Sequence, residues 1–215
     1  MLIRCGVNWT DYWGKLSRSA KKNYKASKNE NSDLAYGQVE YSRRLIERYV
    51  ALWQATSGKT FPEAFVDRLE KLAGKGRLLC FTSVNKIDGV LSLHVIERYG
   101  SLARCHAPWF DYELGNERSL STFMWFSLIE WAANGDKGLF WLDLCGGPVN
   151  RLPRDDYKRR YSPEPDGNVL LVCEQCGFMT IRSISDRNPA ICPECNAVAS
   201  FGLVNRTLLS LARFL

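Results

Sequence analysis

Apolar residues recur at helical spacing in the first third of the chain. They predict a basic helix over residues 13–28, in which apolar side chains return every three or four positions. Residues 33–41 are expected to form a short strand. Two further helices are expected to end at Gly58 and at Gly74, because glycine is common just past the end of a helix.

From residue 77 onward, apolar runs of strand length replace this pattern. Strands are expected over four ranges: 78–84, 90–97, 102–110 and 139–144. An Asp-Gly turn joins the first two as a hairpin, and a helix that begins at Ser119 or Ser121 separates the last two. A hairpin followed by a helical crossover implies a mixed sheet, so the predicted fold class is α/β, with an α+β mixed sheet.

Length and composition are those of a globular protein with a sizeable core. The chain has 215 residues, 46% hydrophobic and 24% charged, which suits one medium domain and a small module. No apolar run approaches the roughly 20 residues of a membrane span, and residues 1–10 lack the apolar segment of a signal peptide. The expectation is a cytoplasmic protein that does not enter a membrane.

Four of the eight cysteines form two Cys-x-x-Cys pairs, separated by fifteen residues: Cys173, Cys176, Cys192 and Cys195. Thiolates at this spacing provide the tetrahedral ligands that Zn²⁺ prefers, and four of them leave no position for a substrate. The spacing predicts one structural zinc ion in a ribbon, and two redox or disulfide pairs are the alternative. Such a ribbon could bind nucleic acid, bind protein or only stabilise a small module.

The first predicted helix carries a stripe of positive charge formed by Lys15, Arg18, Lys22 and Lys25. No acidic residue occurs between Tyr12 and Asn29, and the net charge of the chain is +6. This balance permits an anionic partner without requiring one. The stripe is either a solvated helix face or a surface that meets the phosphates of an anionic donor or a nucleic acid.

Four segments read "LSRSAKKNYKAS", "LIERYVALWQATSGKTFPEAFVDRLEKLAGKGRLLCF", "GLFWLDLCGG" and "DYKRRYSP". Together they resemble GNAT-like acyltransferases, and FemAB-type aminoacyltransferases most closely. The resemblance implies a GNAT-like domain over residues 1–168, before the zinc ribbon over 169–204 and a C-terminal helix over 205–215. It implies an enzyme that moves an activated acyl group onto an amine. FemAB-type proteins contain two such domains, so the alternatives are a homodimer, a partner subunit that supplies the other half, or a different substrate.

In a GNAT-like sheet two neighbouring parallel strands part and leave backbone groups for the acyl donor. The resemblance assigns this role to the strands over 102–110 and 139–144. The N-terminus of the helix between them favours a phosphate, with Ser119 and Ser121 as candidate donor-binding residues. The loop there reads "LGNERSLS" and lacks the Arg/Gln-x-x-Gly-x-Gly/Ala pattern of acetyl-CoA users. The donor therefore stays open between an aminoacyl-tRNA and an acyl-CoA.

Acyl transfer to an amine requires a group that removes a proton and groups that stabilise an oxyanion. The candidate catalytic residues are Asp143, Asp111, Tyr112 and His106. Asp143 lies at the C-terminal end of a predicted strand, where site residues are common, and could instead cap a turn. His94 lies among apolar residues and is better explained as a core histidine. Three cations are candidates for binding donor phosphates, or form a solvated turn: Lys158, Arg159 and Arg160.

Three functions are consistent with these features. The first is an acyl- or aminoacyl-transferase with an accessory zinc ribbon. The second is a transferase that modifies the bases of a nucleic acid, which the basic stripe and the ribbon favour. The third is a binding module that has kept the scaffold without the chemistry, which the small number of histidines favours.

Overall fold

A computed structural model of the chain describes residues 2–4, 8–85, 89–106, 108–110, 118–134, 139, 141–144, 161, 168–173, 175–176, 178–183, 191–192, 195–196 and 201–203. Several predicted features lie outside the described residues: Asp111, Tyr112, Lys158, Arg159, Arg160 and the helix over 205–215. The other predicted site residues, including the four clustered cysteines and the basic stripe, are all described.

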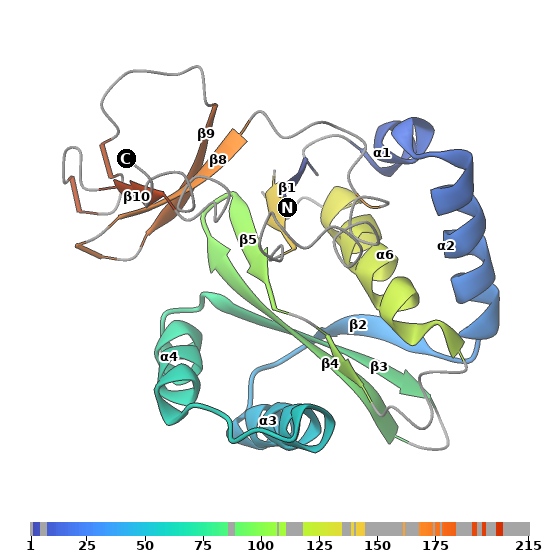
Figure 1. Cartoon of the computed structure of the whole chain (residues 1–215), viewed down its shortest axis with the longest axis horizontal. Helices are drawn as coiled ribbons and strands as arrows, with labels where there is room; N and C mark the ends of the chain where they lie inside the picture. Colours follow the sequence, from blue (N-terminus) through green and yellow to red (C-terminus); the bar gives the residue numbers. More distant parts are fainter. Residues whose placement is uncertain are drawn as a thin grey trace.

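A mixed sheet forms the centre of the described structure (Figure 1). Its strands are β1 (Leu2–Arg4), β2 (Ala35–Val39), β3 (Leu78–Asn85), β4 (Gly89–Tyr99), β5 (Leu102–Cys105), β6 (Trp109–Phe110) and β7 (Trp141–Asp143). They lie in the order β1-β7-β5-β4-β3-β2, and β6 also pairs with β4. Only the β5 and β7 pair is parallel among these described strands. The mixed α/β class predicted from the hairpin and the crossover is confirmed.

Helices cover both faces of this sheet (Figure 1). They are α1 (Trp9–Lys15), α2 (Arg18–Glu30), α3 (Arg43–Ser57), α4 (Glu63–Gly74) and α6 (Leu120–Ala133). α1, α2 and α6 pack on one side, called the α6 face below, and α3 and α4 pack on the other, the α4 face. No helix in the described ranges combines the length and the apolar character that crossing a membrane requires.

The basic helix predicted over residues 13–28 is two helices in the structure. α1 ends at Lys15, and the side-chain oxygen of Ser17 caps α2 by accepting a hydrogen bond from the N–H of Ala20 at 3.1 Å. The apolar spacing hides this break because Leu16 and Ala20 are buried on either side of it. The serine itself is the signal that could have located the new start.

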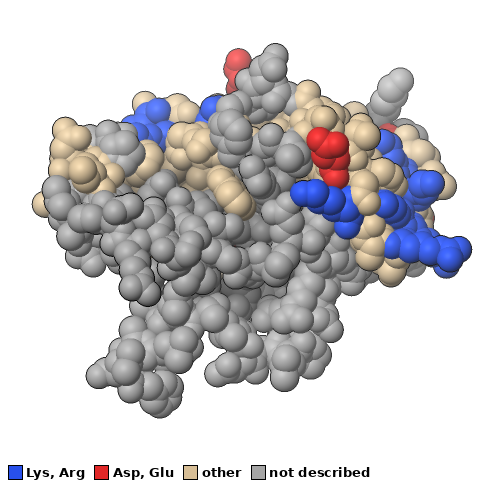
Figure 2. Space-filling view, turned by 90° about the horizontal axis from the view of Figure 1, so that it is seen from above, with Lys and Arg blue, Asp and Glu red and all other residues tan. Residues whose placement is uncertain are grey.

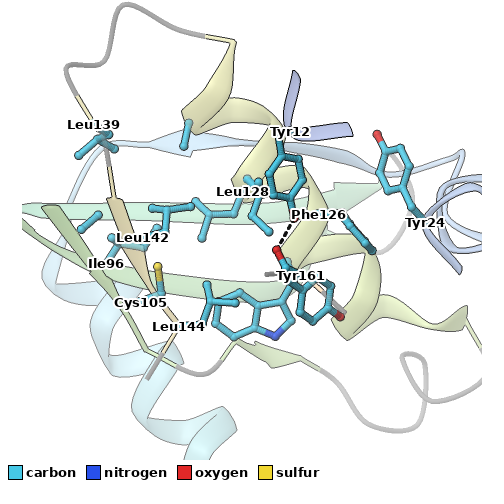
Figure 3. Packing of buried hydrophobic residues seen from close by; sticks show 14 of the residues in the cluster. Tyr12, Tyr24, Ile96, Cys105, Phe126, Leu128, Leu139, Leu142, Leu144 and Tyr161 are labelled. Carbon is cyan, nitrogen blue, oxygen red and sulfur yellow. Dashed lines mark hydrogen bonds between the residues drawn. The ribbon is translucent and has the colours of Figure 1, made fainter. Parts of the chain in front are cut away.

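Residues far apart in the sequence join in the core on the α6 face (Figure 3). Phe126 of α6 packs in one cluster with Leu142 of β7, and burying such side chains contributes about 2–3 kcal/mol each. The hydroxyl of Tyr12 donates a hydrogen bond to the main-chain oxygen of Tyr161 at 2.6 Å. Both tyrosines are fully or almost fully buried. This contact attaches α1 to the segment that precedes the cysteine pairs.

A second, antiparallel sheet contains the first cysteine pair at the end of one strand. Its strands are β8 (Asn168–Cys173), β9 (Met179–Ser183) and β10 (Phe201–Leu203), in the order β10-β8-β9. The sheet lies beside the central one, and β9 comes close to β5 (Figure 1). The expected zinc ribbon over 169–204 stays a prediction, and the structure shows three strands of this region in one small sheet.

Candidate functional site

The parallel pairing of β5 and β7 is short. The register pairs Leu102–Arg104 with Trp141–Asp143. The chain then continues into β6, which among the described residues pairs with β4 and not with β7. The two strands that were predicted to part therefore run together over three residues, and their recorded pairing ends at Arg104 and Asp143.

A β-bulge interrupts the strand predicted over residues 102–110, so that strand is β5 and β6 in the structure. The pairs on either side of the bulge are Ile96 with Cys105 and Leu93 with Trp109. Between these two pairs the sequence has three residues, 106–108, where β4 has two. One of the three is Pro108, which has no N–H for strand pairing. Bulges redirect side chains and end regular pairing, and this one begins at His106.

Three charged residues lie in a row across the sheet at this place. Asp143 of β7 pairs in register with Arg104 of β5, and Arg104 pairs with Glu97 of β4. The residue before each of them belongs to the core on the α6 face, so the three charged side chains alternate to the α4 face. Glu97 is fully buried and Asp143 is 7% exposed. The predicted residue Asp143 thus stands at the end of the pairing of β5 with β7, beside charges that the sequence analysis did not connect with it.

Glu97 is the centre of a hydrogen-bonded group between α4 and the bulge. Its Oε1 lies 2.8 Å from Nε2 of His106. Its Oε2 accepts hydrogen bonds from the hydroxyl of Tyr99 at 2.6 Å and from the guanidinium of Arg68 at 2.5 Å. The side chains of His106 and Arg68 are 16% and 42% exposed, whereas that of Glu97 is inaccessible. The buried carboxylate therefore supports an imidazole that reaches the surface.

Glu97 is ionised at neutral pH despite its burial. Burial alone raises the pKa of this carboxyl, but hydrogen bonds from His106 and Tyr99 and the charges of His106 and Arg68 outweigh it and lower the pKa to about 2. Burial and the neighbouring carboxylate raise the pKa of Tyr99 to about 12, so its hydroxyl keeps the proton that it donates. A carboxylate only accepts, so Nε2 of His106 carries the hydrogen of the bond between them.

In its neutral form His106 therefore has Nδ1 as its basic nitrogen. No hydrogen bond to Nδ1 is found among the described residues, and the ring packs edge-to-face against Phe65 of α4, with centroids 4.9 Å apart. This arrangement can remove a proton at Nδ1, while Glu97 stabilises the imidazolium that forms. The predicted candidate His106 thus has the partner that a general base needs.

His94 is a core histidine, as the sequence analysis expected. It is fully buried on the α6 face, and its ring meets that of Trp125 edge-on at 4.7 Å. Its Nδ1 lies 3.3 Å from the hydroxyl of Tyr36, and its Nε2 lies 2.9 Å from the main-chain oxygen of His106. The two histidines of the chain therefore meet at the bulge from opposite faces of the sheet.

The start of α6 differs from the expected cap. Ser119 stands at the N-cap position, so the predicted helix start is confirmed, but it has a left-handed conformation with a φ of 46° and its side chain makes no capping hydrogen bond. Ser121 lies inside the first turn, which contains no acidic residue. Arg118 stands directly before this turn and forms an ion pair with Asp33. As donor-binding residues, Ser119 and Ser121 stay predictions.

The Sγ atoms of the four predicted zinc ligands lie close together. The Sγ atoms of Cys173 and Cys195 lie 3.5 Å apart, as do those of Cys176 and Cys192, and all four lie within 4.8 Å of one another. Four thiolates bound to zinc at about 2.3 Å lie about 3.8 Å apart, so this donor set fits the ion. The N–H of Cys176 is the main cause that lowers the pKa of Cys173 to about 7, which favours the thiolate that a metal binds.

The predicted basic stripe lies on the exposed side of α1 and α2. Lys15 ends α1, and Arg18, Lys22 and Lys25 follow on α2; all four are exposed. Lys and Arg side chains gather at the end of the molecule where these helices lie (Figure 2). The three cations on α2 have no ion pair within the described part of the chain. An anionic partner for this stripe stays a prediction.

Sequence reasoning missed Glu97 and the residues that surround it. Glu97 stands in the strand "VLSLHVIERY", where a carboxylate among apolar residues needs a buried partner, and that signal could have identified it. Arg68 gave no comparable signal, because an arginine on a helix is ordinary and its contact with Glu97 forms only when α4 packs on the sheet.

Comparison with solved structures shows a shared fold with FemX, in keeping with the GNAT-like fold that the sequence resemblance led us to expect. The chain is similar to FemX, a FemAB-type protein, with a TM-score of 0.59 at 8% sequence identity. The match covers 85% of this chain and spans 59% of the FemX chain. At this identity the likeness shows the fold alone.

An aminoglycoside acetyltransferase from an uncultured soil metagenomic sample, solved in complex with trehalose, is also similar. Its TM-score is 0.47 at 13% identity, over 63% of this chain and 91% of the other. No protein-family model matches the chain, and no curated protein matches its sequence.

Proposed function

We propose that this protein is an acyltransferase that moves an activated acyl or aminoacyl group directly onto an amine. The observation that carries the proposal is the hydrogen bond between His106 and Glu97 at the bulge where the pairing of β5 and β7 ends. In the proposed complex the strands separate beyond this pairing, and a linear acyl donor binds between them beside free backbone groups. His106 then lies next to the acyl carbonyl of the donor, on the α4 face.

The proposed reaction uses His106 first as a base and then as an acid. The acceptor nitrogen attacks the acyl carbonyl carbon and loses a proton to Nδ1 of His106. The tetrahedral oxyanion then collapses, the bond between the acyl carbon and the oxygen or sulfur of the donor breaks, and the leaving atom takes the proton from His106. Glu97 holds Nε2–H throughout and stabilises the imidazolium. His106 ends as it began, with no acyl group attached to the protein.

Asp143 has a supporting role in this proposal. It is almost buried and lies beside Arg104, whereas His106 is more exposed and has a nitrogen directed away from Glu97. We therefore assign the role of the base to His106. Asp143 is proposed to stabilise the neighbouring row of charged side chains. Asp111 and Tyr112, which follow β6 in the sequence, stay candidates for contacts with the acceptor.

The proposed donor is an acyl group on a carrier that contains phosphates, either an aminoacyl-tRNA or an acyl-CoA. The first turn of α6, with Ser119 and Ser121, and the cations Lys158, Arg159 and Arg160 are the proposed phosphate contacts. The stripe on α2 favours RNA, because Arg18 and Lys25 are seven positions apart and extend over about 10 Å of helix. A nucleic-acid base as the acceptor is a second candidate, supported by the same stripe.

We propose that the four cysteines hold one structural zinc ion. Bound there, zinc stabilises the fold of the ribbon, and four thiolates leave it no position for a substrate. The residues Cys173, Cys176, Cys192 and Cys195 therefore maintain the shape of the ribbon and take no part in the transfer.

A thermal-shift screen followed by a transfer assay tests the proposal. The probes are acetyl-CoA, a non-hydrolysable aminoacyl-adenylate analogue and charged tRNA, and a donor that binds the folded state raises the unfolding midpoint by mass action. The His106→Gln variant is expected to keep the midpoint shift and to transfer the acyl group about 10² to 10⁴ times more slowly. The absence of a shift with all three probes, or wild-type transfer by the variant, would overturn the proposal. Mass analysis of RNA and amine products separates the two acceptors.

A further inference from the structure

The bulge leaves the main chain of His106 with an unusual set of partners. Its N–H donates a hydrogen bond to the main-chain oxygen of Val95 at 3.0 Å, as in a regular ladder. Its oxygen instead accepts from the side chain of His94, with 2.9 Å between Nε2 and O. An imidazole on the α6 face thus contacts the backbone of the residue whose side chain reaches Glu97 on the α4 face.

The protons in this arrangement follow from the partners. The main-chain oxygen of His106 only accepts, so Nε2 of His94 carries the hydrogen of that bond. Burial disfavours a charged imidazole, so Nδ1 of His94 is the acceptor of the hydroxyl hydrogen of Tyr36, 3.3 Å away. A directed chain of hydrogen bonds therefore runs from Tyr36 through His94 to the backbone of His106.

From this chain we infer that His94, held in place by Tyr36, is a positioning residue for His106. His106 is then fixed at three atoms: its N–H by Val95, its oxygen by His94 and its Nε2 by Glu97. The inference rests on the proposed function, in which His106 is the base. It adds the interaction that orients this base. The positioning role also explains why the polar side chain of His94 packs against Trp125, where an apolar side chain would have no desolvation cost.

Histidine labelling tests the inference without an enzymatic assay, because the chain contains two histidines. In protein labelled with ¹⁵N at histidine, the ring resonances of His94 are expected to show the Nε2–H tautomer. In the Tyr36→Phe variant, the resonances of His106 are expected to shift although the two side chains share no hydrogen bond. Tyr24→Phe is the matched control: it removes a buried hydroxyl bonded to Glu130 on the same face and should leave His106 unchanged.

The transfer assay adds a second readout. His94→Leu removes the donor to the bulge, whereas His94→Gln keeps an N–H at the end of the side chain. His94→Leu and Tyr36→Phe are expected to lower kcat by between about tenfold and a hundredfold with little change in KM, because the base is misplaced rather than lost. His94→Gln should recover most of that loss. Tyr36→Phe is the mildest change, so it decides the outcome if His94→Leu does not fold.

The possible results separate the inference from the proposed function. Unchanged His106 resonances in both Tyr36→Phe and His94→Leu would overturn the inference, even in a protein that transfers acyl groups. Shifted resonances in a protein without any transferase activity would support the coupling of His94 to His106 and reject the transferase.

Discussion

Nε2 of His106 lies 2.8 Å from a carboxylate oxygen of Glu97, although Glu97 is in β4 and His106 follows β5, on the other side of a turn. The antiparallel pairing of β4 and β5 directs both side chains to the α4 face, and the bulge begins at the histidine. A buried ionised carboxylate and a largely buried imidazole thus stand together where the pairing of β5 and β7 ends.

Replacing Glu97 by Gln is expected to lower kcat by about a hundredfold or more, because the amide cannot stabilise the imidazolium. Glu130→Gln is the matched control, since Glu130 also accepts a hydrogen bond from a tyrosine hydroxyl, that of Tyr24, but on the α6 face. Steady-state rates of acyl transfer for the two variants make the comparison. Equal rates would show that the carboxylate at position 97 has no part in the reaction.

Acid is expected to destabilise the protein through Glu97. Its pKa is about 2 in the folded chain against an ordinary 4.5, so the stabilisation is complete above pH 4.5 and is lost as the pH falls towards 2. The difference is worth about 3 kcal/mol. Urea unfolding of the wild type and of Glu97→Gln between these pH values measures it, and the variant should show a flatter pH dependence.

The exposed residue Glu47 provides the control for this titration. Its pair with Arg43 is open to solvent, so Glu47→Gln should keep the wild-type pH dependence. A wild-type pH dependence in Glu97→Gln as well would contradict the assigned pKa.

Purified protein is expected to contain one zinc ion per chain. Removing it with a chelator should unfold the ribbon, because the thiolates would be left close together without the charge that holds them. Cys176→Ser should lower the zinc content, whereas Cys80→Ser, at a buried cysteine of β3 outside the cluster, should not. Metal analysis of both variants measures this difference in zinc content. Full zinc content in Cys176→Ser would remove this cysteine from the metal site.

Changing Arg18, Lys22 and Lys25 to Gln is expected to weaken RNA binding and to reduce its salt dependence. Each phosphate contact contributes about 0.7 to 0.9 to the slope of log K against log salt, so losing three should lower the slope by about 2 to 3. The control changes three exposed cations of α3, α4 and the residue after α4 to Gln: Arg44, Lys71 and Lys75. Similar slopes for the two triple variants would mean that the stripe is a solvated surface.

The sequence predicted the elements of this fold better than it predicted the site. Apolar periodicity located the β3–β4 hairpin and the crossover helix, because both depend on local patterns. It did not show the break at Ser17 or the bulge at His106, where the apolar pattern continues although the backbone changes direction.

Of the site, the histidine could be predicted but its partners could not. Asp143 was proposed from its place at the end of a strand and His106 from its position near the expected donor site, and the structure brings both to the region where pairing ends. Glu97, Tyr99 and Arg68 join them only through strand register and the packing of α4. β1, which pairs with β7, was missed because three residues are too few for a periodic signal.

The position of a bound donor tests the central claim most directly. A crystal structure grown with the donor that gives the largest thermal shift is expected to show its acyl carbonyl between β6 and β7, beside the bulge and within reach of Nδ1 of His106. A donor bound elsewhere, with β6 and β7 joined by continuous hydrogen bonds, would contradict the account.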